Sequence, residues 1–404
     1  MLQSARVLDL TWVLGGPFGG QLLAQLGAEV IKVEPAGGDP AREIPPHYVG
    51  DLSSFFLSVN RGKKSIALDL KTEAGLTAFY DLVRRSDAVL YGFAPDVPER
   101  LGIDYERLRE INPAIVVGEL IGIHDSGPYK RAPAYDLVVQ ALSGVMSITG
   151  AEDGEPARVG YQIADLAGGL YLALGVSGAL YSAGRTGRGE KVQVSLLDAQ
   201  LGLLTWQAQN YFISGEEPRA KGSRSPNIAP SEAFRCRDGR YLAVSPTGAS
   251  YWRAFCAAMG VPELADDPRF SDRYSRLTNV EQLVEILRPL FLTRDAATWG
   301  KHFFDLRIPA APVLTVSEAL DQETARLRDM VEVAEDPRSG EQVSLLGSPV
   351  KFDGARQLRY PPRHGADTAD VLAELCGYSA ERIGEVLVTD PNHEQQREQH
   401  DQAE

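Results

Sequence analysis

Residues 6–34 read RVLDLTWVLGGPFGGQLLAQLGAEVIKVE. The apolar run at 6–11 is typical of a buried strand, the glycine-rich segment 15–20 follows it, 20–28 has helical spacing, and 29–34 reads as a second strand. Strand–helix–strand units with short connections build parallel sheets. The stretch therefore predicts an α/β fold with a doubly wound parallel sheet. Its glycines do not follow the GxGxxG spacing, so they give little support for a nicotinamide cofactor.

The same alternation continues along the chain. A basic turn that leads into a strand is predicted at 60–71, a helix at 72–85, and further strands at 88–91 and 115–121. The basic turn contains Arg61, Lys63 and Lys64. Such a run is usually a solvated face, but in an acidic protein it could also meet phosphates.

The second half of the chain is expected to hold a smaller domain. Helical spacing continues from Leu196 to about Tyr211, and a Pro-, Gly- and charge-rich stretch follows. Beyond it the pattern predicts a hairpin around 237–240, helices at 250–259, 279–292 and 296–306, a β region at 331–352, and helices at 368–376 and 379–386. The expected division is 1–212 for the first part of a large domain, 213–232 for a linker, 233–320 for a small domain, 321–388 for a part that completes the large domain, and 389–404 for a polar, disordered tail.

Composition limits the classes of function. The 404 residues are 44% hydrophobic, enough for a large core, and carry a net charge of −14. That charge gives no electrostatic footprint for nucleic acid or an anionic membrane, so neither is an expected partner. The three cysteines and six histidines form no metal-binding or redox spacing, and no phosphate-binding loop or GxSxG turn is present. From this pattern we expect no metal and a reduced, cytoplasmic setting. Residues 1–14 also lack the features of a signal peptide.

One carboxylate stands out in the segment 161–194, YQIADLAGGLYLALGVSGALYSAGRTGRGEKVQV. Asp165 opens an uncharged run at 166–184, in which small residues recur at three- and four-residue spacing. This spacing predicts a buried helix whose backbone lies close to its neighbours, and it places Asp165 at the N-cap. From position alone, a structural cap is the favoured interpretation. The alternative is a carboxylate that the helix dipole keeps ionised for chemistry.

Five segments taken in order resemble the family III (CaiB/BaiF-type) CoA-transferases, which include formyl-CoA transferase, carnitine CoA-transferase and α-methylacyl-CoA racemase. They are VLDLTWVLGGPFGGQLLAQLGAEVIKVEPAGGDPAR at 7–42, NRGKKSIALDLK at 60–71, ERLGIDYERLREINPAIV at 99–116, GPYKRAPAYDLVVQALSG at 127–144, and the Asp165 segment through TGRGEKVQVSLLDA. RIPAAPV at 307–313 and HGADTADVL at 364–372 extend the match. The resemblance implies a Rossmann-like large domain made of N- and C-terminal parts, a smaller α+β domain, and two ring-shaped chains interlocked as a homodimer.

The resemblance also implies a mechanism. The aspartate that matches Asp165 is the family's nucleophile, which forms a mixed anhydride with the acyl group and then an aspartyl-CoA thioester. Such chemistry needs a carboxylate in a dry site, because water would hydrolyse the anhydride. The implied substrates are an acyl-CoA and a small carboxylic acid, with no tightly bound cofactor.

CoA contacts carry over from formyl-CoA transferase by position. Tyr135 is expected to help position the site. The expected CoA-binding residues are Gly15, Leu68, Lys71, Gly92, Phe93, Ala94, Arg100 and Asp136. Lys71 and Arg100 would meet phosphates as charge-assisted donors, and the chain near Phe93 would flank the adenine.

Departures from the family pattern bear on the substrate. Leu14 stands where formyl-CoA transferase has a glutamine, and the glycine cluster that closes over that enzyme's site is absent. These differences argue against formate and oxalate as the dedicated pair. Arg42, Arg61 and Arg224 are candidate anion contacts, so a dicarboxylate such as succinate, or a branched C5 acid, is a candidate substrate.

Two alternatives remain open from the sequence. An acyl-CoA racemase or epimerase would use a His and a Glu beside the same Asp. The matching positions hold Tyr135 and Gly248, which favours transfer. A CoA-binding protein without turnover is the second alternative, because residues 91–96 depart from the family pattern.

Overall fold

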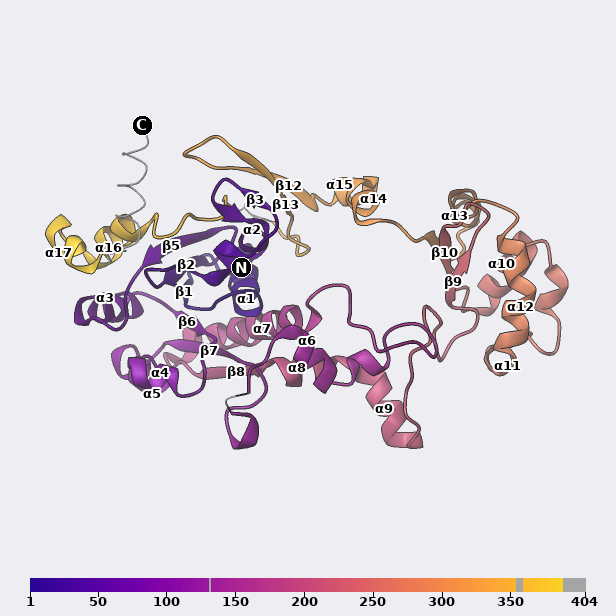
Figure 1. Cartoon of the computed structure of the whole chain (residues 1–404), viewed down its shortest axis with the longest axis horizontal. Helices are drawn as coiled ribbons and strands as arrows, with labels where there is room; N and C mark the ends of the chain where they lie inside the picture. Colours follow the sequence, from indigo (N-terminus) through magenta and orange to yellow (C-terminus); the bar gives the residue numbers. More distant parts are fainter. Residues whose placement is uncertain (131, 354–358, 388–404) are drawn as a thin grey trace. The chain divides into compact units, whose positions relative to one another are not determined.

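The computed structural model describes residues 1–130, 132–353 and 359–387 (Figure 1). The tail predicted at 389–404 lies outside these residues. The chain divides into two compact units, one of 1–145, 158–213 and 327–404, the other of 146–157 and 214–326. Nearly all of the stretch predicted as a linker, from Ser214 to Glu232, belongs to the second unit.

A six-stranded parallel sheet forms the centre of the first unit. Its strands, in spatial order, are β5 (Lys63–Ala67), β2 (Glu29–Glu34), β1 (Arg6–Asp9), β6 (Ala88–Tyr91), β7 (Val116–Ile121) and β8 (Lys191–Ser195). Every neighbouring pair is parallel. The chain order therefore runs outward in both directions from β1 and β6, the doubly wound arrangement with its switch point between these two strands. The predicted α/β fold with a parallel sheet is confirmed.

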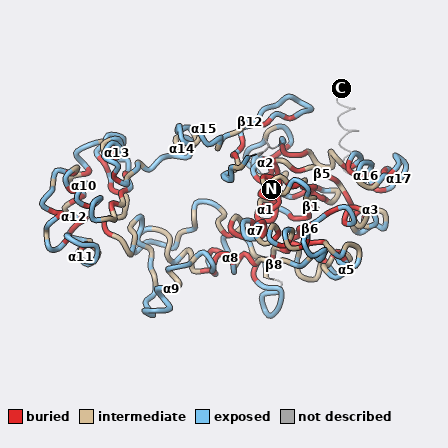
Figure 2. The backbone as a smooth tube through the Cα atoms, turned by 180° about the vertical axis from the view of Figure 1, so that it is seen from behind, coloured by how far each residue is buried: buried red, intermediate tan, exposed pale blue. Residues whose placement is uncertain are grey.

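Alternate residues of the strands face two different helical layers. Val7 and Val30 pack toward α1 (Gly15–Gln25) and α7 (Ile163–Thr186). Leu8 and Ile31 belong instead to the core on the opposite face. The helices of that opposite layer are α3 (Glu73–Val83), α4 (Val97–Leu101), α5 (Tyr105–Ile111), α16 (Thr368–Cys376) and α17 (Ala380–Val386). Figure 2 shows the buried backbone that results along β1 and β6.

The remaining elements of this unit surround the sheet. They are a 3-10 helix at Pro40–Glu43, β3 (Tyr48–Val49), β4 (Leu52–Ser53), α2 (Ser54–Val59), a 3-10 helix at Gly127–Tyr129, α6 (Asp136–Leu142), α8 (Leu196–Leu203), α9 (Thr205–Ser214), β12 (Val331–Glu335) and β13 (Gln342–Leu346). The C-terminal segment joins the sheet edge, where Asp367 accepts a hydrogen bond from Ser65 N at 2.8 Å and Thr368 accepts one from Ala67 N at 3.0 Å.

Three local predictions were wrong. β1 ends at Asp9, because the Asp9 carboxylate accepts from the Thr11 N–H at 3.0 Å and turns the chain. α1 begins at Gly15, so the glycines predicted as a turn lie inside the helix. The helix predicted from 196 to about 211 is broken, because Thr205 adopts a positive φ of 41° between α8 and α9.

α1 and α7 run parallel with their backbones almost in contact. A Cβ atom on Gly19 would lie 3.0 Å from the carbonyl oxygen of Gly169, and one on Gly169 would overlap the carbonyl oxygen of Gly15. Small residues at these positions are therefore a packing requirement. α7 is long and apolar enough to cross a bilayer by length and composition alone, with 44% of its most apolar window buried. The predicted burial holds for the face toward α1 and the sheet, whereas Leu170, Leu174 and Tyr181 are exposed.

The second unit is a small antiparallel sheet covered by helices. The predicted hairpin forms as β9 (Glu232–Arg235) and β10 (Tyr241–Val244), and β11 (Ala310–Pro312) pairs with β10. The helical elements near it are α10 (Ala249–Ala258), a 3-10 helix at Pro262–Ala265, α11 (Arg273–Thr278), α12 (Val280–Phe291), α13 (Ala296–Asp305), α14 (Val316–Asp321) and α15 (Glu323–Leu327). A further 3-10 helix lies at Val145–Ser147. An aromatic core holds the sheet to α10, α12 and α13, with Phe234 stacked on Phe291 at 4.4 Å.

Candidate active site

A cavity of about 860 Å³ lies at the switch point of the parallel sheet. Its walls come from the segments that follow the carboxyl ends of β1, β2, β5 and β6, together with α4. It is lined by Leu10, Trp12, Val33, Glu34, Pro35, Leu68, Asp69, Leu70, Lys71, Leu76, Gly92, Phe93, Ala94, Val97, Arg100 and Leu101. Six of the residues predicted to bind CoA are therefore brought together in one cavity: Leu68, Lys71, Gly92, Phe93, Ala94 and Arg100.

Two cations of this cavity have no side-chain partner within the described part of the chain. Among the described residues, the side chains of Lys71 and Arg100 make no hydrogen bond or ion pair. Both residues are exposed at the rim, and the apolar side chains Leu68 and Phe93 line the same space. A cavity with an apolar wall and two unpaired cations suits a ligand that combines a flat apolar group with phosphates.

Trp12, which the sequence motifs did not indicate, is an aromatic neighbour of Phe93. The Trp12 and Phe93 rings meet edge to face with centroids 5.7 Å apart, and Phe93 stacks on Tyr91 at 6.1 Å. A signal was available, because Trp12 follows the first strand of a predicted doubly wound sheet, where ligands of such folds bind.

Asp165 lies in the first turn of α7 rather than at its N-cap. The helix begins at Ile163 with Gln162 as N-cap, since Gln162 O already accepts from Leu166 N at 3.0 Å. The predicted cap position was wrong because the helix begins two residues before Asp165, at Ile163. The first-turn amide of Ala164 is instead satisfied from a distant element, by the carboxylate of Asp136 at 2.8 Å.

The electrostatic prediction for Asp165 was also wrong. Burial, followed by the negative charge of Asp136, raises the pKa of Asp165 to about 7. If the helix dipole were the only influence on this carboxyl group, it would stabilise the ionised form and lower the pKa. Asp165 therefore titrates near neutral pH, a property typical of functional carboxyl groups.

Gly15 joins Asp165 to the cavity. A Cβ atom on Gly15 would lie 3.0 Å from Asp165 O and 3.1 Å from a methyl group of Leu120. Gly15 ends the loop whose Leu10 and Trp12 line the cavity. On the other side, a Cβ atom on the cavity residue Gly92 would lie 3.3 Å from Leu120 O. Leu120, which the sequence analysis did not single out, thus lies between the cavity and the nucleophile candidate.

Tyr135 and Asp136 lie at the start of α6, outside the list of cavity residues. Tyr135 is 76% exposed and is the N-cap residue. Asp136 is buried, and both its carboxylate oxygens accept hydrogen bonds, from Ala164 N at 2.8 Å and from Gln140 Nε2 at 2.6 Å. The structure therefore places Asp136 against the first turn of α7, next to Asp165, and not among the residues that line the cavity.

The three further arginines proposed as anion contacts all have carboxylate partners. Arg42 binds the buried carboxylate of Glu34 at 2.6 and 2.8 Å. Arg61 binds Glu332 at 2.6 Å, and Arg224 binds Glu232 at 3.2 Å and also Glu281. Because the fold places a carboxylate beside each of these arginines, none of the three is a spare cation. Glu34 lines the cavity, and Arg42 holds the Glu34 carboxylate in place.

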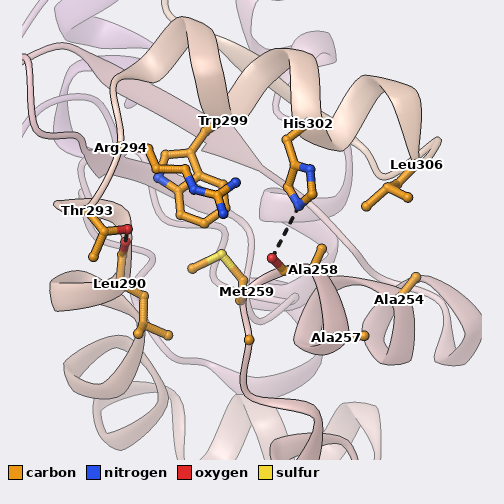
Figure 3. A pocket seen from close by; sticks show the side chains of 11 residues that line it. Ala254, Ala257, Ala258, Met259, Leu290, Thr293, Arg294, Trp299, His302 and Leu306 are labelled. Atoms are coloured by element: carbon orange, nitrogen blue, oxygen red, sulfur yellow. Dashed lines mark hydrogen bonds between the residues drawn. The ribbon is translucent and has the colours of Figure 1, made fainter.

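A second cavity, of about 630 Å³, lies in the small unit between α10 and α13 (Figure 3). Its titratable lining residues are Arg294, which covers the ring of Trp299 at 4.5 Å, and His302, whose Nε2 lies 3.3 Å from Ala258 O. This cavity has no carboxylate or thiol lining. Within the described ranges, no group of three or more His, Cys, Asp and Glu residues could hold a metal ion.

Comparison with known proteins agrees with this geometry. The sequence model described as CoA-transferase family III matches residues 2–368. An acetyl-CoA:oxalate CoA-transferase of Acetobacter aceti is 39% identical over 350 residues, covering 86% of this chain and 88% of that protein. A succinyl-CoA:glutarate CoA-transferase of Mus musculus is 34% identical over 389 residues, covering 96% of this chain and 89% of that protein. The crystal structure of a CaiB/BaiF family protein from Brucella suis superposes with a TM-score of 0.81 at 32% identity, covering 93% of this chain and 99% of that one. The chain therefore belongs to the CoA-transferase family III and is an enzyme of that family.

Proposed function

We propose that this enzyme transfers CoA from an acyl-CoA to a free carboxylic acid, with Asp165 as covalent nucleophile. One observation carries the proposal. The carboxyl-bearing turn at Asp165 packs against Gly15, at the end of the loop that lines the cavity holding the two unpaired cations. In this proposal Lys71 and Arg100 bind CoA phosphates, Trp12 and Phe93 flank the adenine, and the pantetheine arm runs along the Leu120 region to Asp165.

The proposed reaction then proceeds in four steps. The Asp165 carboxylate attacks the thioester carbonyl, which gives a mixed anhydride and the CoA thiolate. The thiolate attacks the aspartyl carbonyl, so the first acid leaves as its carboxylate and Asp165 carries CoA as a thioester. The acceptor carboxylate attacks this thioester and releases the thiolate again. The thiolate finally attacks the acceptor's acyl carbonyl, which yields the new acyl-CoA and free Asp165.

The environment of Asp165 supports this role. The residue is partly buried, and Gly15, which packs on its backbone, is uncharged, so water has restricted access to an anhydride formed there. A pKa of about 7 leaves a large fraction of the group ionised at neutral pH while keeping it basic enough to attack an acyl carbon. The first amides of a helix have no intrahelical acceptor, so those of α1 are available to an oxyanion near Gly15.

A dicarboxylate is the proposed acceptor class. The relatives named above act, by their names, on oxalate and on glutarate with acetyl-CoA or succinyl-CoA as the donor. We propose succinyl-CoA or another dicarboxylyl-CoA as donor. The argument from Leu14 against a dedicated formate and oxalate pair remains a prediction, and the oxalate relative makes oxalate the first acceptor to compare with glutarate.

We further propose a homodimer as the working assembly. The exposed face of α7 carries Leu170, Leu174 and Tyr181, and Phe212 and Ile213 of α9 are 73% and 77% exposed. Side chains of this kind are usually covered in solution, and a second copy of the chain is the proposed cover. Light scattering at micromolar concentration would report a mass of twice 43.9 kDa; a monomeric mass would contradict it.

Transfer of CoA from succinyl-CoA to glutarate, followed by separation of the two thioesters, tests the function. The wild-type enzyme is expected to form glutaryl-CoA, and Asp165→Asn is expected to lose the activity. Asp198→Asn is the matched control, because Asp198 occupies the same position of the first turn in α8 and is exposed. Loss of activity in both variants, or in neither, would contradict a specific role for Asp165.

A further inference from the structure

Two buried polar residues of α6 hold the segment that leads to Asp165. The Asp136 carboxylate accepts from Ala164 N at 2.8 Å and from Gln140 Nε2 at 2.6 Å. The side-chain oxygen Oε1 of Gln140 accepts from Val159 N at 2.9 Å. Gln140 is fully buried and Asp136 is 8% exposed. The pair, which we name the α6 clamp, thus fixes the approach to α7 at two points five residues apart.

These two polar side chains lie beside an apolar cluster, where packing alone does not require polar groups. Val139 lies between them on α6 and forms an apolar cluster with Ala164 and Leu196. Apolar side chains of similar size would fill this space without the cost of removing a carboxylate from water. The clamp is fully paired, and buried polar networks of this kind specify one geometry more strictly than apolar contacts do.

We propose that Asp136 and Gln140 are positioning residues for the transfer reaction: their hydrogen bonds hold the first turn of α7 so that the Asp165 carboxyl faces the acyl group, and the negative charge of Asp136 acts on that carboxyl. The inference rests on the proposed function and assigns to Asp136 a role other than CoA binding. Neither residue needs to touch the substrate. The effect passes through Ala164, the residue directly before Asp165.

The charged surroundings of Asp165 allow the two effects to be separated. Within the described part of the chain, Asp136 is the one charged group found to shift the pKa of Asp165. α1 contributes Gly15 at the contact, β7 contributes Leu120, and α8 contributes Leu196 and the neutral Gln200, which donates to Ile163 O at 3.2 Å. Removing the Asp136 charge should therefore lower the pKa of Asp165.

Three variants separate hydrogen bonding from charge. Asp136→Asn keeps an oxygen that accepts from Ala164 N, but it removes the negative charge. It also places the NH2 group of the new asparagine against the NH2 group of Gln140, so that two donors face each other. Gln140→Leu leaves Val159 N and one Asp136 oxygen without their partner. The exchange variant Asp136→Asn with Gln140→Glu restores every hydrogen bond of the clamp, because the amide now donates from position 136 and the carboxylate accepts at position 140. Ser143→Ala is the control, a buried hydroxyl on the same stretch that donates to the backbone oxygen of Gln140 at 3.1 Å.

The readout is the rate of covalent adduct formation with succinyl-CoA across pH 5 to 9, together with kcat and KM for the full reaction. Gln140→Leu should lower kcat about 10- to 100-fold with little change in the KM for succinyl-CoA, since misplacing a reacting group by about 1 Å has effects of this size. The exchange variant should recover most of the lost rate. Asp136→Asn should move the acid limb of the pH profile to lower pH, and Ser143→Ala should leave both unchanged.

Three results would overturn the inference. The first is a wild-type rate in Gln140→Leu, and the second is a lost rate that the exchange variant does not recover. The third is an acid limb of the pH profile that Asp136→Asn leaves in place. If the wild-type protein forms no adduct at all, the proposed function falls, and the inference falls with it. An adduct in the wild type with unchanged variants overturns the inference alone.

Discussion

Gly15 of α1 packs directly on the backbone of Asp165 in α7, so closely that a Cβ atom at Gly15 would lie 3.0 Å from Asp165 O and 3.3 Å from Asp165 Cα. Few real Cβ atoms come so near to backbone atoms. The position of the Asp165 turn therefore depends on the absence of side chains between two parallel helices. It also depends on the loop before Gly15, which lines the cavity at the switch point of the sheet.

Gly169→Ala should disturb this contact strongly. Its new methyl group would overlap Gly15 O, so α1 and α7 must separate. Overpacking of this kind costs typically about 1–3 kcal/mol of unfolding free energy, and the adduct rate should fall with it. Gly184→Ala is the control, since it lies in the same helix with open space around it and alanine favours helix by up to about 1 kcal/mol. Denaturant unfolding of both variants measures the difference; equal stabilities would contradict the close packing.

Lys71→Gln and Arg100→Gln should weaken CoA binding. Each removes a cation that has no described protein partner, so no internal ion pair is lost. Charge-assisted hydrogen bonds contribute roughly 1.5–3 kcal/mol, and the Kd for CoA should rise about tenfold or more per variant. Calorimetry with CoA measures it, and the effect should shrink at high salt. Lys301→Gln, a surface lysine paired with Asp305, is the control. An unchanged Kd in both cavity variants would place the phosphates elsewhere.

Asp165→Asn should stabilise the fold at high pH. Because the pKa of Asp165 is about 7 when folded and near 3.8 otherwise, the native state binds an extra proton between these values. Wild-type stability therefore falls as pH rises from about 4 to 7, by up to about 4 kcal/mol from this group. The asparagine variant does not lose stability in this way. The difference in unfolding free energy between the variant and the wild type should therefore be near zero at pH 4 and largest above pH 7. Unfolding at pH 4, 6 and 8 tests the trend; a constant difference would contradict the raised pKa.

Arg42→Met should destabilise the protein rather than change its choice of acid. Burial opposes ionisation of Glu34, but bonds from Arg42 outweigh it and lower its pKa to about 2. Without Arg42 a buried carboxylate loses its main partner, which typically costs about 3–5 kcal/mol. The double variant with Glu34→Gln should recover part of this loss, so the cycle gives the coupling between the two residues. A variant of normal stability with a raised KM for dicarboxylates only would restore the role of Arg42 as a substrate contact.

Some of this arrangement could be predicted from the sequence. The strand–helix–strand pattern at 6–34 indicated the parallel sheet, because local apolar periodicity reports burial in such sheets. The motif positions identified six residues that share one cavity. The small-residue spacing of 166–184 indicated close helix packing, although it did not show that Gly169 meets Gly15.

The rest depended on contacts between distant parts of the chain. Nothing near Asp165 shows that Asp136, twenty-nine positions away, caps its helix and raises its pKa. The arginines at 42, 61 and 224 seemed unpaired because their carboxylate partners are brought to them only by folding. Leu120 occurs in an ordinary apolar strand, and only the register of β7 places it between Gly92 and Gly15.

The most direct measurement is peptide mass spectrometry after the enzyme is mixed with succinyl-CoA and trapped with hydroxylamine or by acid quench. We predict a hydroxamate or CoA thioester on Asp165 in the wild-type protein and in Asp198→Asn, and none in Asp165→Asn. The adduct should form faster as the pH rises through about 7, because the ionised carboxyl is the nucleophile. An Asp165 peptide that stays unmodified across a panel of acyl-CoAs, while glutaryl-CoA still forms, would contradict covalent transfer through this residue.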